Sequence, residues 1–163
     1  MSSLSVRVPA SSANLGPGFD TLGMALSLYL EMGTVDGSPL PERAKVVEAS
    51  HPAFVAFRHV GGTGDVWVRS SIPMGRGLGF SGAARVAGVV LAHAQRNGPD
   101  SLIRDRKELL RLATELEGHP DNVGASLVGG VTASSGGEVV RLPLGFDPAF
   151  IAWVPDFQTS TEK

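Results

Sequence analysis

The sequence predicts one domain that contains both β-strands and α-helices, with strands toward both ends of the chain. The N-terminal stretch LSVRVPA alternates apolar and polar side chains, as a strand with one buried face does. A run rich in Ala and Val begins at Ser81 and is apolar on most sides, which is typical of a buried helix. The length of 163 residues, 42% of them hydrophobic, suits a single globular core.

Local signals predict the other elements in chain order. Extended stretches are expected at residues 4–10, 21–35, 66–72, 131–134, 138–142 and 150–154, and helices at residues 51–60, 81–97, 105–117 and 120–128. Pro9 is expected to end the first strand. Asp105 and Glu108 have the spacing of a capping box, and Gly118 is expected to end the helix that they begin.

Composition excludes several classes of function. A net charge of −2 argues against a nucleic-acid partner, which usually leaves a basic footprint. No apolar run approaches the roughly 20 residues of a membrane span, and the N-terminus does not resemble a secretory signal. The chain has no cysteine, so it has neither a disulfide nor a thiolate metal site. These features are consistent with a cytoplasmic protein.

The most informative stretch is PMGRGLGFSGAA, residues Pro73 to Ala84, which lies between a predicted strand and a predicted helix. Glycine allows the backbone to turn its N–H groups toward a ligand. A helix that starts there adds unpaired amides and the positive end of its dipole, which together favour phosphate. The alternative is a tight turn, because the stretch matches neither a P-loop nor a dinucleotide fingerprint.

Two other stretches combine glycine with polar side chains. PASSANLGPGFD places Asn14 and Asp20 in a loop, where they either face a ligand or form a wide turn. EGHPDNVGASLVGG begins at Glu117 and includes His119, Asp121 and Asn122, which is more polar groups than a helix cap requires.

In the order and separation of these three stretches, the chain closely resembles the N-terminal part of homoserine kinases, a family of GHMP small-molecule kinases. The resemblance covers essentially all 163 residues. It implies an α+β fold of the ribosomal protein S5 domain 2-like type, a mostly antiparallel sheet with helices packed on it. It also implies the phosphorylation of the L-homoserine hydroxyl by ATP and Mg²⁺ on the route to threonine.

The resemblance also implies roles for individual residues. Those expected to contact ATP are Pro73, Met74, Gly75, Arg76, Gly77, Leu78, Gly79, Phe80, Ser81, Gly82 and Ala83. Ser81 and Glu117, with Glu115 as second choice, are expected to hold Mg²⁺. Asn14 and Asp20 match the loop that faces the amino acid. Asp121 and Asn122 are expected to orient the reacting groups rather than to accept a proton, because phosphoryl transfer needs little help from a base.

Three departures from the family pattern leave alternatives open. Phe80 stands where the family usually has a serine, and its ring either turns away from the phosphates or blocks them. The segment between Gly37 and Val66 is shorter than in relatives, so the adenine contacts are not assigned. Family members are about twice as long, so residues 1–163 are expected to be the ATP-binding domain without its C-terminal partner. Another GHMP kinase, a catalytically silent nucleotide-binding domain and a homo-oligomer all remain open.

Overall fold

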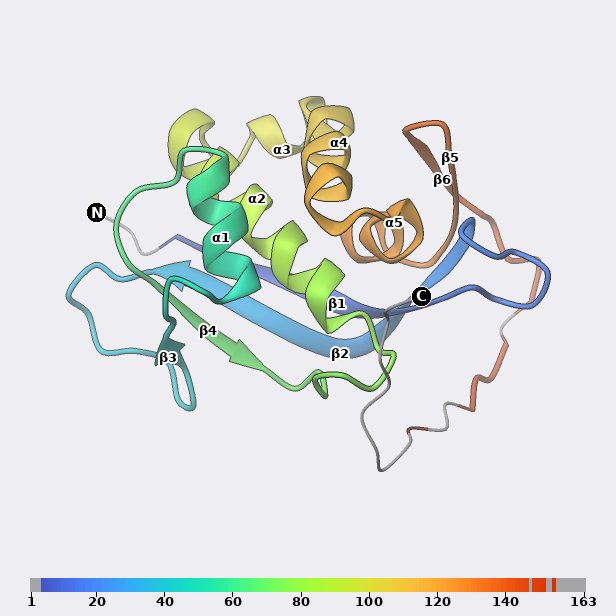
Figure 1. Cartoon of the computed structure of the whole chain (residues 1–163), viewed down its shortest axis with the longest axis horizontal. Helices are drawn as coiled ribbons and strands as arrows, with labels where there is room; N and C mark the ends of the chain where they lie inside the picture. The colour runs from blue at the N-terminus through green and yellow to red at the C-terminus, as the bar shows by residue number, and fades with distance from the viewer. Residues whose placement is uncertain (1–3, 147, 152–153, 155–163) are drawn as a thin grey trace.

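The computed structural model describes residues 4–146, 148–151 and 154 (Figure 1). Its strands are β1 (Ser5–Ala13), β2 (Leu22–Thr34), β3 (Lys45–Val46), β4 (Val66–Ser70), β5 (Val131–Ser135) and β6 (Glu138–Arg141). Its helices are α1 (Pro52–His59), α2 (Phe80–Asn97), α3 (Ser101–Arg104), α4 (Arg106–Glu117) and α5 (Pro120–Val128). None of the helices in these residues is long and apolar enough to cross a bilayer.

The strand β2, 13 residues long, is the centre of a six-stranded sheet. It pairs with β1 along one edge, and along the other edge with β5 near its start and β4 near its end. The short strand β3 extends the sheet beyond β4, and β6 extends it beyond β5. Every pairing is antiparallel, which confirms the α+β fold with a mostly antiparallel sheet.

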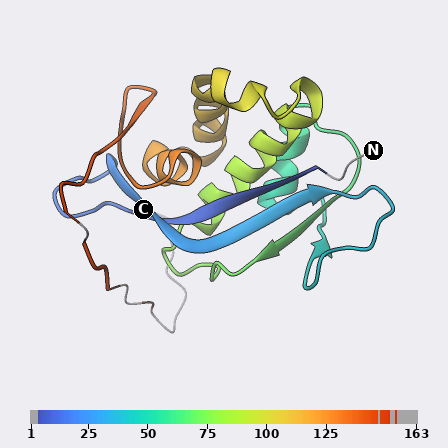
Figure 2. The ribbon, with the colours of Figure 1, turned by 180° about the vertical axis from the view of Figure 1, so that it is seen from behind.

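The helices of the described residues cover one face of this sheet (Figures 1 and 2). As predicted, α2 is central: its buried side chains form one core with Val8, Leu30 and Met32 of the sheet. Gly88 allows α1 to pack tightly against α2, because a Cβ atom there would collide with the carbonyl oxygen of Ala53. Within the same described residues, the other face of the sheet carries no helix (Figure 2).

The prediction that Pro9 ends the first strand was wrong. The strand β1 continues to Ala13, and its register against β2 shifts between Pro9 and Ala10. Proline is tolerated at this point because β1 pairs only with β2 in the part of the chain that the structure describes, and edge strands and bulges can accommodate a missing N–H. The continuation matters for function, since it brings Ser11 against the glycine loop, where its N–H donates to the carbonyl of Leu78 at 3.2 Å.

The predicted capping box at Asp105 was also wrong. The Asp105 side chain makes no capping hydrogen bond to α4. It interacts instead with Arg104 and with His93 of α2, whose Nε2 lies 3.0 Å from Asp105 Oδ2. The hydrogen bond from Arg104 is the main reason that the pKa of Asp105 falls to about 2. Arg104 and, on another helix, His93 therefore take the Asp105 side chain away from the local cap.

Other differences lie at short elements. The sequence signals did not predict β3 or α3, which are 2 and 4 residues long. Of the strand expected at 150–154, residues 152 and 153 lie outside the described part. Phe150, Ile151 and Val154 are described, and they lie in no strand.

Candidate active site

One cavity of about 660 Å³ brings together the three polar stretches identified in the sequence. Its lining residues are Ala13, Asn14, Phe19, Asp20, Pro73, Gly75, Arg76, Gly77, Leu78, Gly79, Phe80, Ser81, Arg85, Glu117, His119, Asp121 and Asn122. The charged side chains among them are three carboxylates and two guanidinium groups. Such a mixture suits a ligand that carries both anionic and cationic groups.

The glycine loop has the backbone of an anion-binding nest. Gly75, Gly77 and Gly79 have φ values of 68°, 70° and 66°, so every second residue adopts the left-handed conformation that favours glycine. Alternation of this kind turns successive N–H groups into one concavity. Gly79 is also the N-cap residue of α2, and no side chain caps the helix. The first amides of α2 therefore face the cavity with the positive end of the helix dipole.

Close packing against β1 makes glycine necessary at the end of the loop. A Cβ atom on Gly79 would collide with Ser11 Oγ and would lie 3.0 Å from Asn122 Oδ1. Ser11 Oγ itself donates a hydrogen bond to Asn122 Oδ1 at 2.9 Å. This contact ties β1, the glycine loop and α5 to one another beneath the cavity.

The helix α5 contributes a second N-terminus to the cavity. Pro120 occupies its first turn, as predicted, and the N-cap residue His119 makes no side-chain capping bond. The Asp121 carboxylate is almost completely buried, with 1% exposure, and its Oδ1 accepts from the Asn122 N–H at 2.7 Å. Asp121 and Asn122 thus have fixed positions at the cavity wall, as orienting groups require.

The two predicted metal ligands are in direct contact. Ser81 Oγ donates to Glu117 Oε2 at 2.9 Å, which joins the first turn of α2 to the last residue of α4. Arg85 forms an ion pair with Glu117 Oε2, and its Nη1 also donates to Ser81 Oγ at 2.8 Å. Burial lowers the pKa of the Arg85 guanidinium from its ordinary value.

Arg85 is the charged residue of this cavity that the sequence reasoning missed. The signal that could have found it is its position four residues after Ser81 on a helix, since residues at this spacing share a face. The apolar residues after Ser81 predict a core helix and assign no role to Arg85.

The N-terminal loop closes over the rim of the cavity through its two predicted substrate residues. The N–H of Asp20 donates to Asn14 Oδ1 at 2.8 Å. Both residues have positive φ values, 58° at Asn14 and 53° at Asp20, a conformation that Asn and Asp tolerate better than most residues. Both side chains are exposed. The loop therefore presents a carboxylate at the entrance, on a backbone held by an amide side chain.

Comparison with known proteins identifies the family. The sequence pattern of the GHMP kinase N-terminal domain matches residues 44–130. The chain belongs to the GHMP kinases.

The similar proteins in this family include homoserine kinases. That of Clavibacter michiganensis is 48% identical over 143 residues, covering 78% of this chain and 45% of that protein. That of Desulfitobacterium hafniense is 39% identical over 176 residues, covering 97% of this chain and 58% of that protein. The solved homoserine kinase of Cytophaga hutchinsonii matches 88% of this chain and 52% of its own, with 26% identity and a TM-score of 0.63. The chain thus spans about half the length of the curated relatives it matches.

Another solved structure supports the fold alone. The mevalonate kinase of Methanococcus jannaschii has a TM-score of 0.57 but only 13% identity, over 87% of this chain and 56% of its own. This likeness therefore concerns the architecture and carries no argument about the reaction.

Most of the predicted ATP-binding residues of this GHMP kinase domain line the cavity, and three do not. Met74 is 65% exposed to solvent, and it does not line the cavity. Gly82 and Ala83 are buried in the first turn of α2, where a Cβ atom on Gly82 would lie 3.3 Å from Asn122 Cβ. Gly82 therefore serves the packing of α2 on α5, and this helix contributes Phe80, Ser81 and Arg85 to the cavity.

The ring of Phe80, which departs from the family pattern, packs against other side chains. It meets the ring of His51 edge-on, with centroids 6.0 Å apart and an interplanar angle of 78°. It also packs, partly buried, against the hydrophobic core. Phe80 lines the cavity, and its ring contacts the His51 ring and the hydrophobic core. The position therefore has a structural use that does not require its side chain to meet a phosphate.

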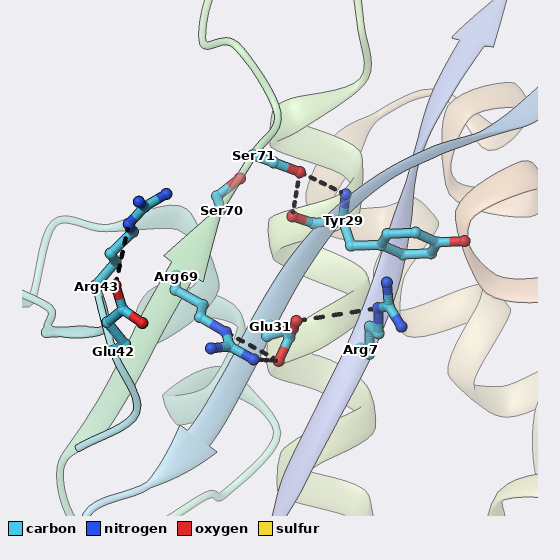
Figure 3. Close-up of a pocket in the computed structure, with 8 residues that line it drawn as sticks. All are labelled: Arg7, Tyr29, Glu31, Glu42, Arg43, Arg69, Ser70 and Ser71. Carbon is cyan, nitrogen blue, oxygen red and sulfur yellow. Dashed lines mark hydrogen bonds and ion pairs between the residues drawn. The ribbon is translucent and has the colours of Figure 1, made fainter. Parts of the chain in front are cut away.

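A second cavity, of about 480 Å³, lies at the helix-free face of the sheet (Figure 3). Figure 3 shows Glu31 between two arginines: Arg69 Nη2 lies 2.7 Å from Glu31 Oε2, and Arg7 Nε lies 4.0 Å from Oε1. The guanidinium of Arg7 also stacks 3.7 Å from the centroid of the Tyr29 ring. These contacts form a row of charges across β1, β2 and β4.

Proposed function

We propose that this chain is the ATP-binding part of a homoserine kinase, which transfers the γ-phosphoryl group of ATP to the side-chain hydroxyl of L-homoserine. The observation that carries the proposal is that the glycine nest, the Asn14–Asp20 loop and the α5 N-terminus line one cavity. Residues 1–163 correspond in this proposal to the N-terminal domain, and the relatives' remaining length to a second domain. The enzyme would act in the cytoplasm, in threonine synthesis.

In this proposal the glycine loop binds the ATP phosphates. The amides of the nest and of the first turn of α2 donate hydrogen bonds to phosphate oxygens. The α5 N-terminus adds a second positive dipole end at the same cavity. These donors are held in place by the Ser11–Asn122 contact before any ligand arrives, which is how preorganised sites stabilise developing charge without reorganising.

Ser81 and Glu117 would hold the Mg²⁺ ion. The hydroxyl and carboxylate oxygens suit this hard cation, which commonly takes one or two protein carboxylates and completes its shell with phosphates and water. Within the described residues there is no cluster of three or more His, Cys, Asp or Glu. A two-residue site of this kind therefore fits magnesium bound together with ATP. When bound, magnesium neutralises charge on the transferred group.

Asn14 and Asp20 would hold the amino acid. The Asp20 carboxylate at the rim pairs with the ammonium group of homoserine, on a loop that Asn14 closes. Asp121 and Asn122 keep the wall of the cavity rigid, so that the hydroxyl and the phosphate meet in line. Positioning of this kind supplies most of the rate in phosphoryl transfer.

The proposal predicts that Asp20→Asn weakens homoserine binding about tenfold and leaves ATP binding unchanged, because only the amino acid carries an ammonium group. Both affinities are measured by calorimetric titration with Mg·ATP and with L-homoserine. Asp36→Asn is the matched control, since it removes an exposed carboxylate from a loop outside the cavity.

The outcomes separate the alternatives. Equal losses for both ligands in Asp20→Asn would refute the assigned role of Asp20. Binding of Mg·ATP without phosphorylation of homoserine would indicate a nucleotide-binding domain without this activity. Phosphorylation of mevalonate in place of homoserine would assign the chain to another GHMP kinase.

A further inference from the structure

The ion pair between Arg85 and Glu117 occupies the same oxygens that the metal would use. Glu117 is the last residue of α4, and the last turn of α4 contains no basic residue. A carboxylate at the negative end of a helix dipole needs a cation nearby. Arg85 provides that cation from α2, and the same guanidinium contacts Ser81 Oγ. The described structure therefore places a positive charge at the proposed metal site.

Partial burial strengthens the ion pair between Arg85 and Glu117. The Arg85 side chain is 28% exposed and that of Glu117 14% exposed, so neither charge is freely solvated. A partly buried charge that loses its partner is costly, unlike a charge at an open surface. Glu117 can release Arg85 readily only when another cation neutralises it and another anion receives the guanidinium.

We propose that Arg85 is a positioning residue that closes the metal site until nucleotide is present. In the ligand-free protein it neutralises Glu117 and occupies Ser81. When nucleotide phosphates fill the glycine nest at the start of α2, the guanidinium turns to a phosphate oxygen, and Glu117 and Ser81 become available for the cation. This inference rests on the proposed function, because it assumes the phosphate and metal sites described above.

The position of Arg85 means that its guanidinium needs to move only a short way from Glu117 to a phosphate in the glycine nest. Arg85 lies one helical turn after Ser81, and both line the cavity together with the nest. Its planar guanidinium is suited to carboxylate and phosphate oxygens alike. The two states thus differ by a rotation of one side chain between a carboxylate and a phosphate, with α2 and α4 unchanged.

The first test measures cation binding without nucleotide. The full chain is titrated with Mn²⁺ in a calorimeter as wild type, Arg85→Met, Glu117→Gln and Arg43→Met. Arg43 is the matched control, because it removes an equal charge from a highly exposed side chain outside this cavity. Arg85→Met is expected to bind Mn²⁺ about tenfold more tightly than wild type, the value of one charge-assisted contact, and Arg43→Met to bind like wild type.

These variants test the role of Arg85 separately from the metal site at Ser81 and Glu117. Weaker Mn²⁺ binding in Glu117→Gln, together with unchanged or weaker binding in Arg85→Met, would overturn the role of Arg85 and leave the metal site in place. Mn²⁺ binding by the double variant Arg85→Met/Glu117→Gln that is as tight as that of Arg85→Met would overturn the metal site itself.

A second test measures ATP binding in EDTA, where no cation is present. Glu117→Gln is expected to bind metal-free ATP several-fold more tightly than wild type, because it releases Arg85. In the double variant Arg85→Met/Glu117→Gln this gain should disappear, and the double-mutant cycle measures the coupling directly. A gain of the same size in the double variant would overturn the proposal, since it would come from removal of the carboxylate alone. Arg85→Gln, which also removes the charge but keeps a polar side chain, replaces Arg85→Met in both tests if circular dichroism shows that Arg85→Met is unfolded.

Discussion

At the scale of single residues, Phe80 shows how a departure from a family pattern can be structural. Its side chain packs between the core and the His51 ring, while its backbone belongs to the first turn of α2. A phosphate cradle made of backbone amides does not depend on the side chain at this position. The arrangement supports the interpretation in which Phe80 permits ATP to bind.

We therefore predict that Phe80→Ser destabilises the domain by about 2 kcal/mol, through lost packing of a partly buried ring, and changes ATP affinity less than about twofold. Urea unfolding and calorimetric titration measure the two effects separately. Phe80→Leu, which retains most of the apolar volume, is the control and should lose less stability. A tenfold gain in ATP affinity in Phe80→Ser would show that the ring obstructs the phosphates.

At the scale of elements, the start of α1 depends on the neutral form of a histidine. His51 is the N-cap residue, and its Nδ1 accepts from the Ala53 N–H at 3.2 Å. A protonated Nδ1 has no lone pair for this bond. Burial also lowers the pKa of His51 from its ordinary value of 6.5. Folding thus favours the neutral ring for two independent reasons.

The sign of the pH effect follows from that shift. Below pH 6.5 the unfolded chain binds a proton at this position more readily than the folded protein does, so stability falls as the pH falls through this range. We predict that His51→Asn, which keeps a capping side chain but does not titrate, has a smaller loss of melting temperature between about pH 7 and pH 5. Parallel thermal melts of both proteins measure this. An identical pH dependence would contradict the assigned role of His51.

At the scale of the whole molecule, the described part of the chain forms a sheet with one helix-covered face and one face without helices. On the helix-free face Arg7, Glu31 and Arg69 are aligned by the strand registers, with the carboxylate between the two cations. Opposite charges across neighbouring strands stabilise a sheet modestly, and like charges there destabilise it. The central carboxylate therefore keeps two arginines from repelling each other.

We predict that Glu31→Gln destabilises the protein by about 1–2 kcal/mol, from the loss of two cross-strand pairs, and that the difference shrinks in high salt. Glu42→Gln, which changes a highly exposed glutamate at the same cavity, should have almost no effect. Denaturant unfolding at low and high ionic strength gives both comparisons. A loss independent of salt would point to packing rather than charge.

The sequence predicted the longer elements and most of the cavity lining because their signals are local. Glycine spacing, apolar periodicity and Pro120 all act within a few residues of the element that they specify. The failures involve partners far away in the sequence. Asp105 interacts with His93 of another helix as well as with its neighbour Arg104, β2 supports the strand beyond Pro9, and Glu117 gives Arg85 a role that no motif indicated.

The pairing of β2 with β5 has a consequence for the order in which the cavity forms. The contact from Ser11 to Asn122 spans 111 residues, and β5 reaches β2 only after the chain has passed through all five helices. Contacts this distant in sequence close late, because the loop between them must first lose its freedom. A nascent chain would therefore have its hairpin of β1 and β2 and its glycine loop well before the proposed nucleotide site was complete, and the ATP binding proposed for that site would appear as one of the last steps of folding.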